Sequence, residues 1–210
     1  MVCDMKRFVF VGCLFLTLAA QAVTLKEVFF KMPTEVLPIL NLAARRDLVD
    51  FYENKQTAAV LSVFDSKVVL SAFSEDYLLL KTSSVSTLQV KLLPMADSTV
   101  VLLINTATGP LPDSRARIYT KNWKPMVGVF MPVLYPRYFL DTTRLNAEQV
   151  HRFDQLCQRF FVRMDVDPVT PHIHIRASFS EVVPHDLLAP FEGFYTDSLT
   201  LTWNGKGFQF

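Results

Sequence analysis

The chain has 210 residues, half of them hydrophobic, and its 21 basic and 20 acidic side chains leave a formal net charge of +1. A charge this close to zero creates no field that would attract nucleic acid or anionic lipid, so we exclude nucleic acid as a partner. With only six glycines and no glycine-rich phosphate loop, the sequence also argues against the nucleotide-binding folds that need one.

The first 22 residues have the features of an export signal. Lys6 and Arg7 precede an apolar run over residues 8–18, and Ala20-Gln21-Ala22 supplies a small-x-small cleavage site. The run is too short to cross a bilayer, which takes about 20 residues. We therefore predict that residues 1–22 are a signal peptide, and that the protein is exported to the periplasm or outer-envelope space of a Gram-negative bacterium without a transmembrane anchor.

A lipid anchor on Cys13 is the alternative, because Gly12 places a small residue before this cysteine. Only residues 8–12 would then form the apolar region, which is shorter than the roughly 7 to 15 residues expected, so we predict no lipid. Either Met1 or Met5 fits as the start. Cys157 is the only cysteine after the signal, so no internal disulfide is expected.

Two helical segments are predicted next. Residues 25–31 favour a short helical turn, and Thr34 has the character of an N-cap for a second segment. Residues 41–54 predict an amphipathic helix, because apolar side chains recur at helical spacing on one face. Arg45 belongs to the opposite, solvated face in this pattern.

The hydrophobic period then changes from about 3.6 to about 2, which is typical of strands. We expect strands at residues 67–72, 77–83, 86–93, 99–106 and 115–121. Their short connections require antiparallel neighbours and hence a meander. Gln89 and Lys91 alternate with apolar residues, which indicates a half-buried strand. Residues 100–104 are apolar on both faces and should be covered on both, with the helix over 41–54 as one cover.

Residues 125–144 predict an apolar connector, because Pro125, Pro132 and Pro136 prevent a regular helix or a central strand. Its aromatic and methionine side chains are of the types enriched at interface cores, so it is our candidate surface for an envelope protein or peptide. The alternative is that these side chains cap the end of the core. The candidate partner-binding residues are Phe130, Met131, Leu134, Tyr135, Tyr138 and Phe139.

The last third of the chain predicts one helix and three strands. Residues 145–164 favour a helix, capped by Asn146 and carrying Cys157 in its apolar stripe. Strands follow at 172–179 and 198–203, and a turn at Asn204-Gly205 leads into residues 207–210.

This order of elements predicts an α+β fold in which helices pack on an antiparallel meander sheet. Residues 23–210 then form a single domain. Because helix-then-strands occurs twice, two subunits at 23–124 and 145–210, joined by a connector at 125–144, remain an open alternative.

His172 and His174 are weak candidates for a metal site. They alternate on one strand and therefore project from the same face, with His185 or Glu181 as a possible third ligand. The competing interpretation is an ordinary solvated face, since Arg176 on that face would repel a cation. We favour the second interpretation and predict no catalytic residue and no cofactor. A non-enzymatic binding module is the leading function, and a metal-dependent or other hydrolase centred on His172 and His174 is the alternative.

Several short stretches resemble an exported Bacteroidales family described only as domain of unknown function 3256. The resemblance covers most of the mature chain and is strongest over residues 31–123. It implies a Gram-negative envelope setting and nothing about catalysis. More loosely, the layout is similar to β-lactamase-inhibitor-like and PepSY-type modules. The stretches are Lys31-Met32-Pro33, Arg46-Asp47-Leu48-Val49-Asp50-Phe51, Asp76-Tyr77, Gln89-Val90-Lys91-Leu92-Leu93, Asp97-Ser98, Asp113-Ser114, Tyr119-Thr120 and Trp123.

Overall fold

The computed structural model describes residues 23–96, 98–128 and 130–210. The expected signal peptide, its cleavage site and Cys13 lie outside these residues. Within the described ranges, no helix combines the length and the apolar character needed to cross a membrane.

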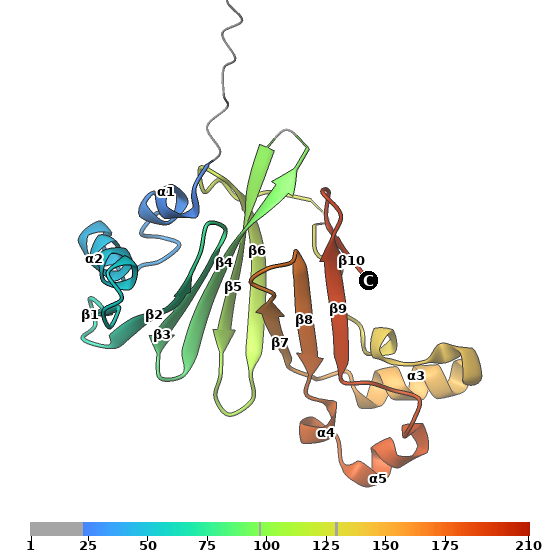
Figure 1. Ribbon diagram of the computed structural model, residues 1–210. Helices are drawn as coiled ribbons and strands as arrows, with labels where there is room; N and C mark the ends of the chain where they lie inside the picture. The colour runs from blue at the N-terminus through green and yellow to red at the C-terminus, as the bar shows by residue number, and fades with distance from the viewer. Residues whose placement is uncertain (1–22, 97, 129) are drawn as a thin grey trace, which may run out of the picture.

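The fold is α+β, which confirms the class predicted from the sequence (Figure 1). Its largest element is a six-stranded antiparallel sheet in which the strands are neighbours in chain order. These strands are β1 (Ala59–Leu61), β2 (Lys67–Phe73), β3 (Tyr77–Ser83), β4 (Ser86–Met95), β5 (Ser98–Ala107) and β6 (Asp113–Thr120).

A second, four-stranded antiparallel sheet follows in the order β10-β9-β8-β7. Its strands are β7 (Val162–Val166), β8 (His172–Ala177), β9 (Ser198–Trp203) and β10 (Phe208–Gln209). The strands predicted at 77–83 and 198–203 are confirmed residue for residue, whereas β1 was not predicted because it has only three residues and alternates too briefly to show a period.

Two helices cover one face of the first sheet. They are α1 (Leu25–Phe30), capped by Thr24, and α2 (Leu42–Glu53), capped by Asn41. Their apolar side chains share a buried cluster with Leu88, Val90 and Val101 of the sheet. The predicted cover over 41–54 is thus confirmed, while the segment expected to begin at Thr34 forms turns and not a helix.

Arg45 departs from its predicted place on the solvated face of α2. Its side chain is buried and donates hydrogen bonds to the backbone carbonyls of Phe29 and Met32. Those carbonyls lie at the end of α1, where a helix leaves acceptors without intrahelical partners. Arg45 therefore joins the two helices, and burial lowers the pKa of its guanidinium.

The second sheet covers the other face of the first. Leu102 and Ile104 of β5 share a buried cluster with Met164, Ile173 and Ile175 of the second sheet. Both faces of β5 are therefore buried, which confirms the prediction for residues 100–104.

The predicted half-buried strand at 86–93 is wrong in one respect. Gln89 and Lys91 are not exposed, because the second sheet lies over their face and leaves them 3% and 2% exposed. A buried polar side chain must find partners. Gln89 donates to the carbonyl of Met164 and accepts from the N–H of Val166, and so pairs the free edge of β7 with the first sheet.

The predicted long helix over 145–164 is also wrong in its second half. Helix α3 (Ala147–Leu156) begins at the predicted cap Asn146, with the full capping box to Gln149, but ends at Cys157. Residues 162–166 form β7 instead, because they pair with β8. Pairing with the next strand thus decides the structure of a stretch in which Met164 also fits the spacing of the preceding helix.

The remaining elements are short. Between β6 and α3 lie two 3-10 helices, η1 (Pro136–Phe139) and η2 (Thr142–Arg144). After β8 the chain forms α4 (Phe179–Val182), α5 (His185–Leu188) and η3 (Ala189–Phe191). The predicted turn between β9 and β10 is confirmed, and Gly205 adopts a φ of 87° there, a conformation that glycine tolerates best.

Candidate functional site

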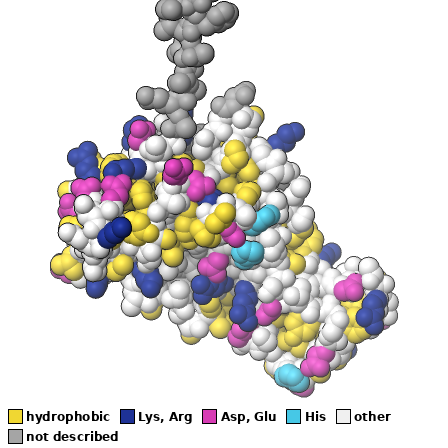
Figure 2. Space-filling model, in the orientation of Figure 1, with side chains coloured by type: hydrophobic (Ala, Val, Ile, Leu, Met, Phe, Trp, Pro, Cys, Tyr) yellow, Lys and Arg dark blue, Asp and Glu magenta, His cyan; other side chains and the backbone are white. Residues whose placement is uncertain are grey.

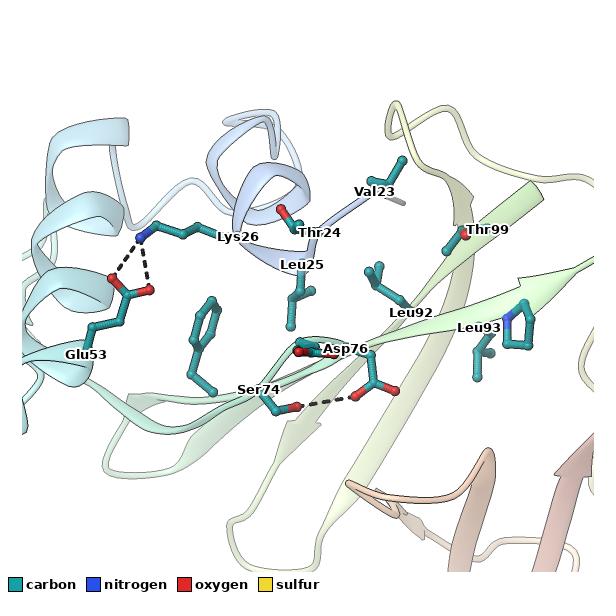
Figure 3. A pocket seen from close by; sticks show the side chains of 13 residues that line it. Val23, Thr24, Leu25, Lys26, Glu53, Ser74, Asp76, Leu92, Leu93 and Thr99 are labelled. Atoms are coloured by element: carbon teal, nitrogen blue, oxygen red, sulfur yellow. Dashed lines mark hydrogen bonds and ion pairs between the residues drawn. The ribbon is translucent and has the colours of Figure 1, made fainter. Parts of the chain in front are cut away.

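A pocket of about 730 Å³ lies between α1 and the ends of strands β2 to β5 (Figure 3). We call it the α1 pocket. Most of its wall is apolar: Val23, Phe73 and Pro94 keep accessible surface, and the buried Leu25 and Leu92 lie beneath them. The same region of the surface shows hydrophobic side chains with acidic ones among them (Figure 2).

The pocket forms because β4 extends beyond the first residue of its neighbour β3. The last pair between β3 and β4 joins Tyr77 to Lys91, although β4 continues to Met95. Beyond that pair, the N–H of Leu92 donates to the carbonyl of Asp76. The start of α1 is held across the gap by a hydrogen bond from the N–H of Leu25 to the carbonyl of Glu75.

Four ionisable side chains line the α1 pocket, and two ion pairs involve three of them. At one end, Lys26 Nζ lies 2.8 Å from Glu53 Oε2 (Figure 3). Asp76 Oδ2 lies 2.8 Å from Nζ of the buried Lys91 and its Oδ1 accepts from Ser74 Oγ. Glu75 forms no ion pair with any described residue and is exposed.

Lys91 contacts Asp76 from the layer between the two sheets, behind the pocket wall. Besides Asp76, its ammonium donates to the carbonyl of Pro168 at 2.7 Å and lies 6.0 Å from the centre of the Tyr77 ring. Tyr77 in turn donates to Gln89 Oε1, and burial raises the pKa of its phenol. Asp76 is therefore held in place from behind, by groups that a ligand in the pocket does not reach.

The sequence predicted none of the α1 pocket as a site. Residues 74–76 fall in a short connection between two predicted strands, and Lys91 on the polar side of another. The one signal available was a lysine in a strand whose neighbours are strongly apolar, which is a costly place for a charge without a buried partner.

His172 and His174 lie where the sequence placed them, on the outward face of β8, and the space-filling view shows two adjacent histidines (Figure 2). Their Nδ1 atoms bond to Thr202 and Thr200. His174 Nε2 lies 3.8 Å from Asp167, whose pKa is lowered by hydrogen bonds from the backbone of Thr170 and Val169.

The suggested third ligands do not join this pair. His185 lies in α5 and contacts Glu192, with Nε2 3.2 Å from Oε1. Glu181 lies in α4 and accepts from Ser180. No three metal-ligating side chains gather anywhere in residues 23–96, 98–128 and 130–210. The outward face of β8 is thus polar, and its two histidines are hydrogen-bonded to threonines of β9.

Cys157 lies at the end of α3 and is fully buried. Burial, with a smaller contribution from Asp154, raises the pKa of its thiol to about 12. A reactive cysteine needs a lowered pKa and access to solvent, so this arrangement is that of a packing side chain.

The six candidate partner-binding residues divide into two groups. Phe139 is buried, and Phe130, Met131 and Leu134 are partly buried and pack on the core between the sheets. Tyr135 and Tyr138 remain 46% and 43% exposed. The two tyrosine rings contact each other edge-on, and Tyr138 also contacts Phe210 with ring centres 4.8 Å apart.

Three comparisons with known proteins bear on this chain. A family model described as "Protein of unknown function (DUF3256)" matches residues 17–208. A solved structure titled "Structure of a domain of an uncharacterized protein from Porphyromonas gingivalis W83" is similar with a TM-score of 0.71 and 22% identity, and the match covers 88% of this chain and 96% of that one. The search of curated proteins returned no match. At this identity the likeness shows the fold alone.

Proposed function

The chain belongs to the DUF3256 family, as its resemblance predicted, and we propose that it is a non-enzymatic binding module of the Gram-negative envelope with the α1 pocket as its ligand site. The observation that carries this proposal is the pocket itself. Its volume of about 730 Å³ lies within the range of about 300 to 1,000 Å³ that is usual for small-molecule sites.

The composition of the wall supports binding. Ligand sites are mostly apolar, with a few polar groups that orient the ligand. In the α1 pocket, aliphatic side chains and Phe73 form the apolar part, and Ser74, Glu75 and Asp76 lie together on one turn between β2 and β3. The pocket is thus suited to a ligand with an apolar body and one polar end.

The polar groups lack the relationships that covalent catalysis uses. A serine nucleophile needs a base within hydrogen-bond reach. The base within reach of Ser74 Oγ is the Asp76 carboxylate, and this carboxylate is engaged in an ion pair with Lys91. This ion pair favours a role for Asp76 in orienting a ligand over a role in taking up a proton.

The envelope setting is carried by the pattern at the start of the chain. Two basic residues, a short apolar run and Ala20-Gln21-Ala22 together form the usual order of an export signal.

A test uses a neutral fluorescent probe, N-phenylnaphthylamine, titrated against wild-type protein and Thr99→Trp. Thr99 is half-buried in the wall and pairs with Pro94, so the indole should fill the pocket and raise the dissociation constant about tenfold or more. Thr108→Trp is the matched control, because Thr108 follows the opposite end of β5 and lies outside the pocket. This variant should bind the probe as tightly as wild type does. Equal binding by Thr99→Trp and wild type would overturn the proposal.

A further inference from the structure

The six-stranded sheet ends in β1, on the side that lies away from the second sheet (Figure 1). Alternate residues of an antiparallel strand direct their N–H and carbonyl groups to the same side. The carbonyl of Ala58 and the N–H of Ser62 bond toward β2, so Ala59 and Leu61 face outward. The N–H and carbonyl of Leu61 and the carbonyl of Ala59 have no hydrogen-bond partner among the described residues.

Three large apolar side chains are exposed at this edge and in the turn that follows it. Leu61 is 66% exposed, Val63 56% and Phe64 73%. The nine residues 56–64 also carry no charge, although sheet edges of soluble proteins are usually protected by charged side chains. An edge that combines unpaired backbone groups with exposed apolar side chains is suited to pairing with another strand.

We propose that two copies of this protein pair antiparallel along β1 and form a symmetric dimer with one continuous sheet. This inference does not depend on the α1 pocket. A strand paired antiparallel with itself around a two-fold axis is self-complementary, so the same edge supplies both halves of the interface.

The distribution of charge favours a second copy as the partner. Because residues 56–64 are uncharged, two identical edges meet without the repulsion that like charges cause when they lie opposite each other. The lysine nearest in the ladder, Lys67, lies on β2 across from Leu61. The two copies of Lys67 would be three strand spacings apart, about 14 Å, where salt screens most of their repulsion.

The opposite edge of the sheet explains why association should stop at two copies. On β6, the carbonyl of Ile118 accepts from the N–H of Met126 in the connector. Further along β6, the Ser114 hydroxyl accepts from the N–H of Met164 in the second sheet. The connector and the second sheet thus both lie along β6, and this arrangement favours a closed dimer over an open array.

Sedimentation equilibrium of wild-type protein without its predicted signal peptide tests the proposal. We would measure the weight-average mass from about 5 µM to about 500 µM protein. A three-residue strand forms a small interface, so the dimer should populate mainly at the upper end of this range. The mass should rise toward twice the monomer value and go no further.

Leu61→Glu tests whether β1 forms the interface. Within one copy the new carboxylate lies across from Lys67, so folding should be retained, but in the dimer it brings like charges together. The dissociation constant should rise about tenfold or more. Phe64→Ser should weaken the dimer in the same direction. Val169→Glu is the matched control, because Val169 is 85% exposed and lies in the turn between β7 and β8; it should dimerise as wild type does. Thermal unfolding of each variant checks that it is folded.

Three outcomes would overturn the dimer. These are a wild-type protein that is still monomeric at about 500 µM, association that continues past two copies, and equal dimerisation of Leu61→Glu and Val169→Glu. Flotation with vesicles of phosphatidylethanolamine and phosphatidylglycerol covers the competing partner. If the protein is monomeric and floats with these vesicles, and Phe64→Ser does not float, the exposed side chains belong to a lipid surface and the dimer proposal fails.

Discussion

Gln89 joins the two sheets through one side chain. Its amide donates to the carbonyl of Met164 at 3.1 Å, and its oxygen accepts from the N–H of Val166 at 2.9 Å and from the hydroxyl of Tyr77 at 3.3 Å. The free edge of β7 would otherwise bury backbone groups without partners. An unpaired sheet edge is also a site of unwanted association.

The first prediction concerns this side chain. Gln89→Leu keeps the size and adds apolar surface, yet it should lower the free energy of unfolding by about 2 to 4 kcal/mol, because each buried polar group left unpaired costs about 1 to 3 kcal/mol. Urea unfolding measures the change. Gln158→Leu, at an exposed position, should stay within about 0.5 kcal/mol of wild type. Similar stability for the two variants would refute the role given to Gln89.

The second prediction uses the titration of Cys157. Its pKa is raised from an ordinary value of 9.0 to about 12 in the folded protein, so between these values the folded state holds a proton that the unfolded chain has lost. The free energy of unfolding should therefore fall as the pH rises through this window. Cys157→Ala should cost roughly 1 kcal/mol at pH 7 but show a shallower decline from pH 8 to pH 10.

Thiol labelling of native wild-type protein provides the control for Cys157. It should be slow at pH 8, because the thiol is both buried and protonated. Rapid labelling, or the same decline with pH in both proteins, would contradict a packing role.

At the scale of elements, the connector between β6 and α3 contains both core and surface. Arg137 ties it to α3, since the N–H of Arg137 donates to Asp154 and their side chains form an ion pair at 2.6 Å. Phe139 enters the aromatic core and packs edge-on to Phe179, with ring centres 5.2 Å apart. Tyr135 and Tyr138 stay at the surface.

The third prediction follows from this division. Phe139→Ala should lower the free energy of unfolding by about 3 to 5 kcal/mol, as truncation of a buried aromatic does. Tyr135→Ser and Tyr138→Ser should each cost less than about 1.5 kcal/mol, because both rings keep much of their surface in water. Denaturant unfolding of the three variants decides the matter. Losses of several kcal/mol in the tyrosine variants would place them in the core and end their candidacy as partner-binding residues.

The elements differ in how far the sequence determined them. Helix α2 and most strands could be predicted, because the helical spacing over residues 41–54 and the alternation over residues 88–92 are local signals. Residues 162–166 could not, since Phe160 and Met164 continue the helical spacing of Val150, Phe153 and Cys157, and pairing with β8 selects the strand. The α1 pocket could not be predicted either, because its walls come from residues that are far apart in the chain, such as Leu25 and Leu92.

At the scale of the whole molecule, the two sheets share one buried cluster. It contains Leu102 and Ile118 of the first sheet together with Ile175 and Leu201 of the second. The turn that carries Glu75 and Asp76 is linked to this layer through Lys91. Asp76, in the wall of the α1 pocket, is therefore tied to the layer between the two sheets.

The fourth prediction concerns export of the whole chain. Cleavage near Ala22 should yield a protein that begins at about Val23 and carries no lipid, because the apolar run before Cys13 is too short for a lipoprotein signal. Intact-mass analysis of the protein recovered from the envelope fraction measures this. A mass that fits a diacylated Cys13 would show the prediction to be wrong.

The most direct test of the α1 pocket is to map where N-phenylnaphthylamine binds by amide chemical shifts in ¹⁵N-labelled protein. The account predicts saturable shifts at Leu25, Glu75, Leu92 and Thr99, which line the pocket, and their loss in Thr99→Trp. Shifts confined to the surface around Tyr135 and Tyr138, or to the face of β8 that carries His172 and His174, would contradict it.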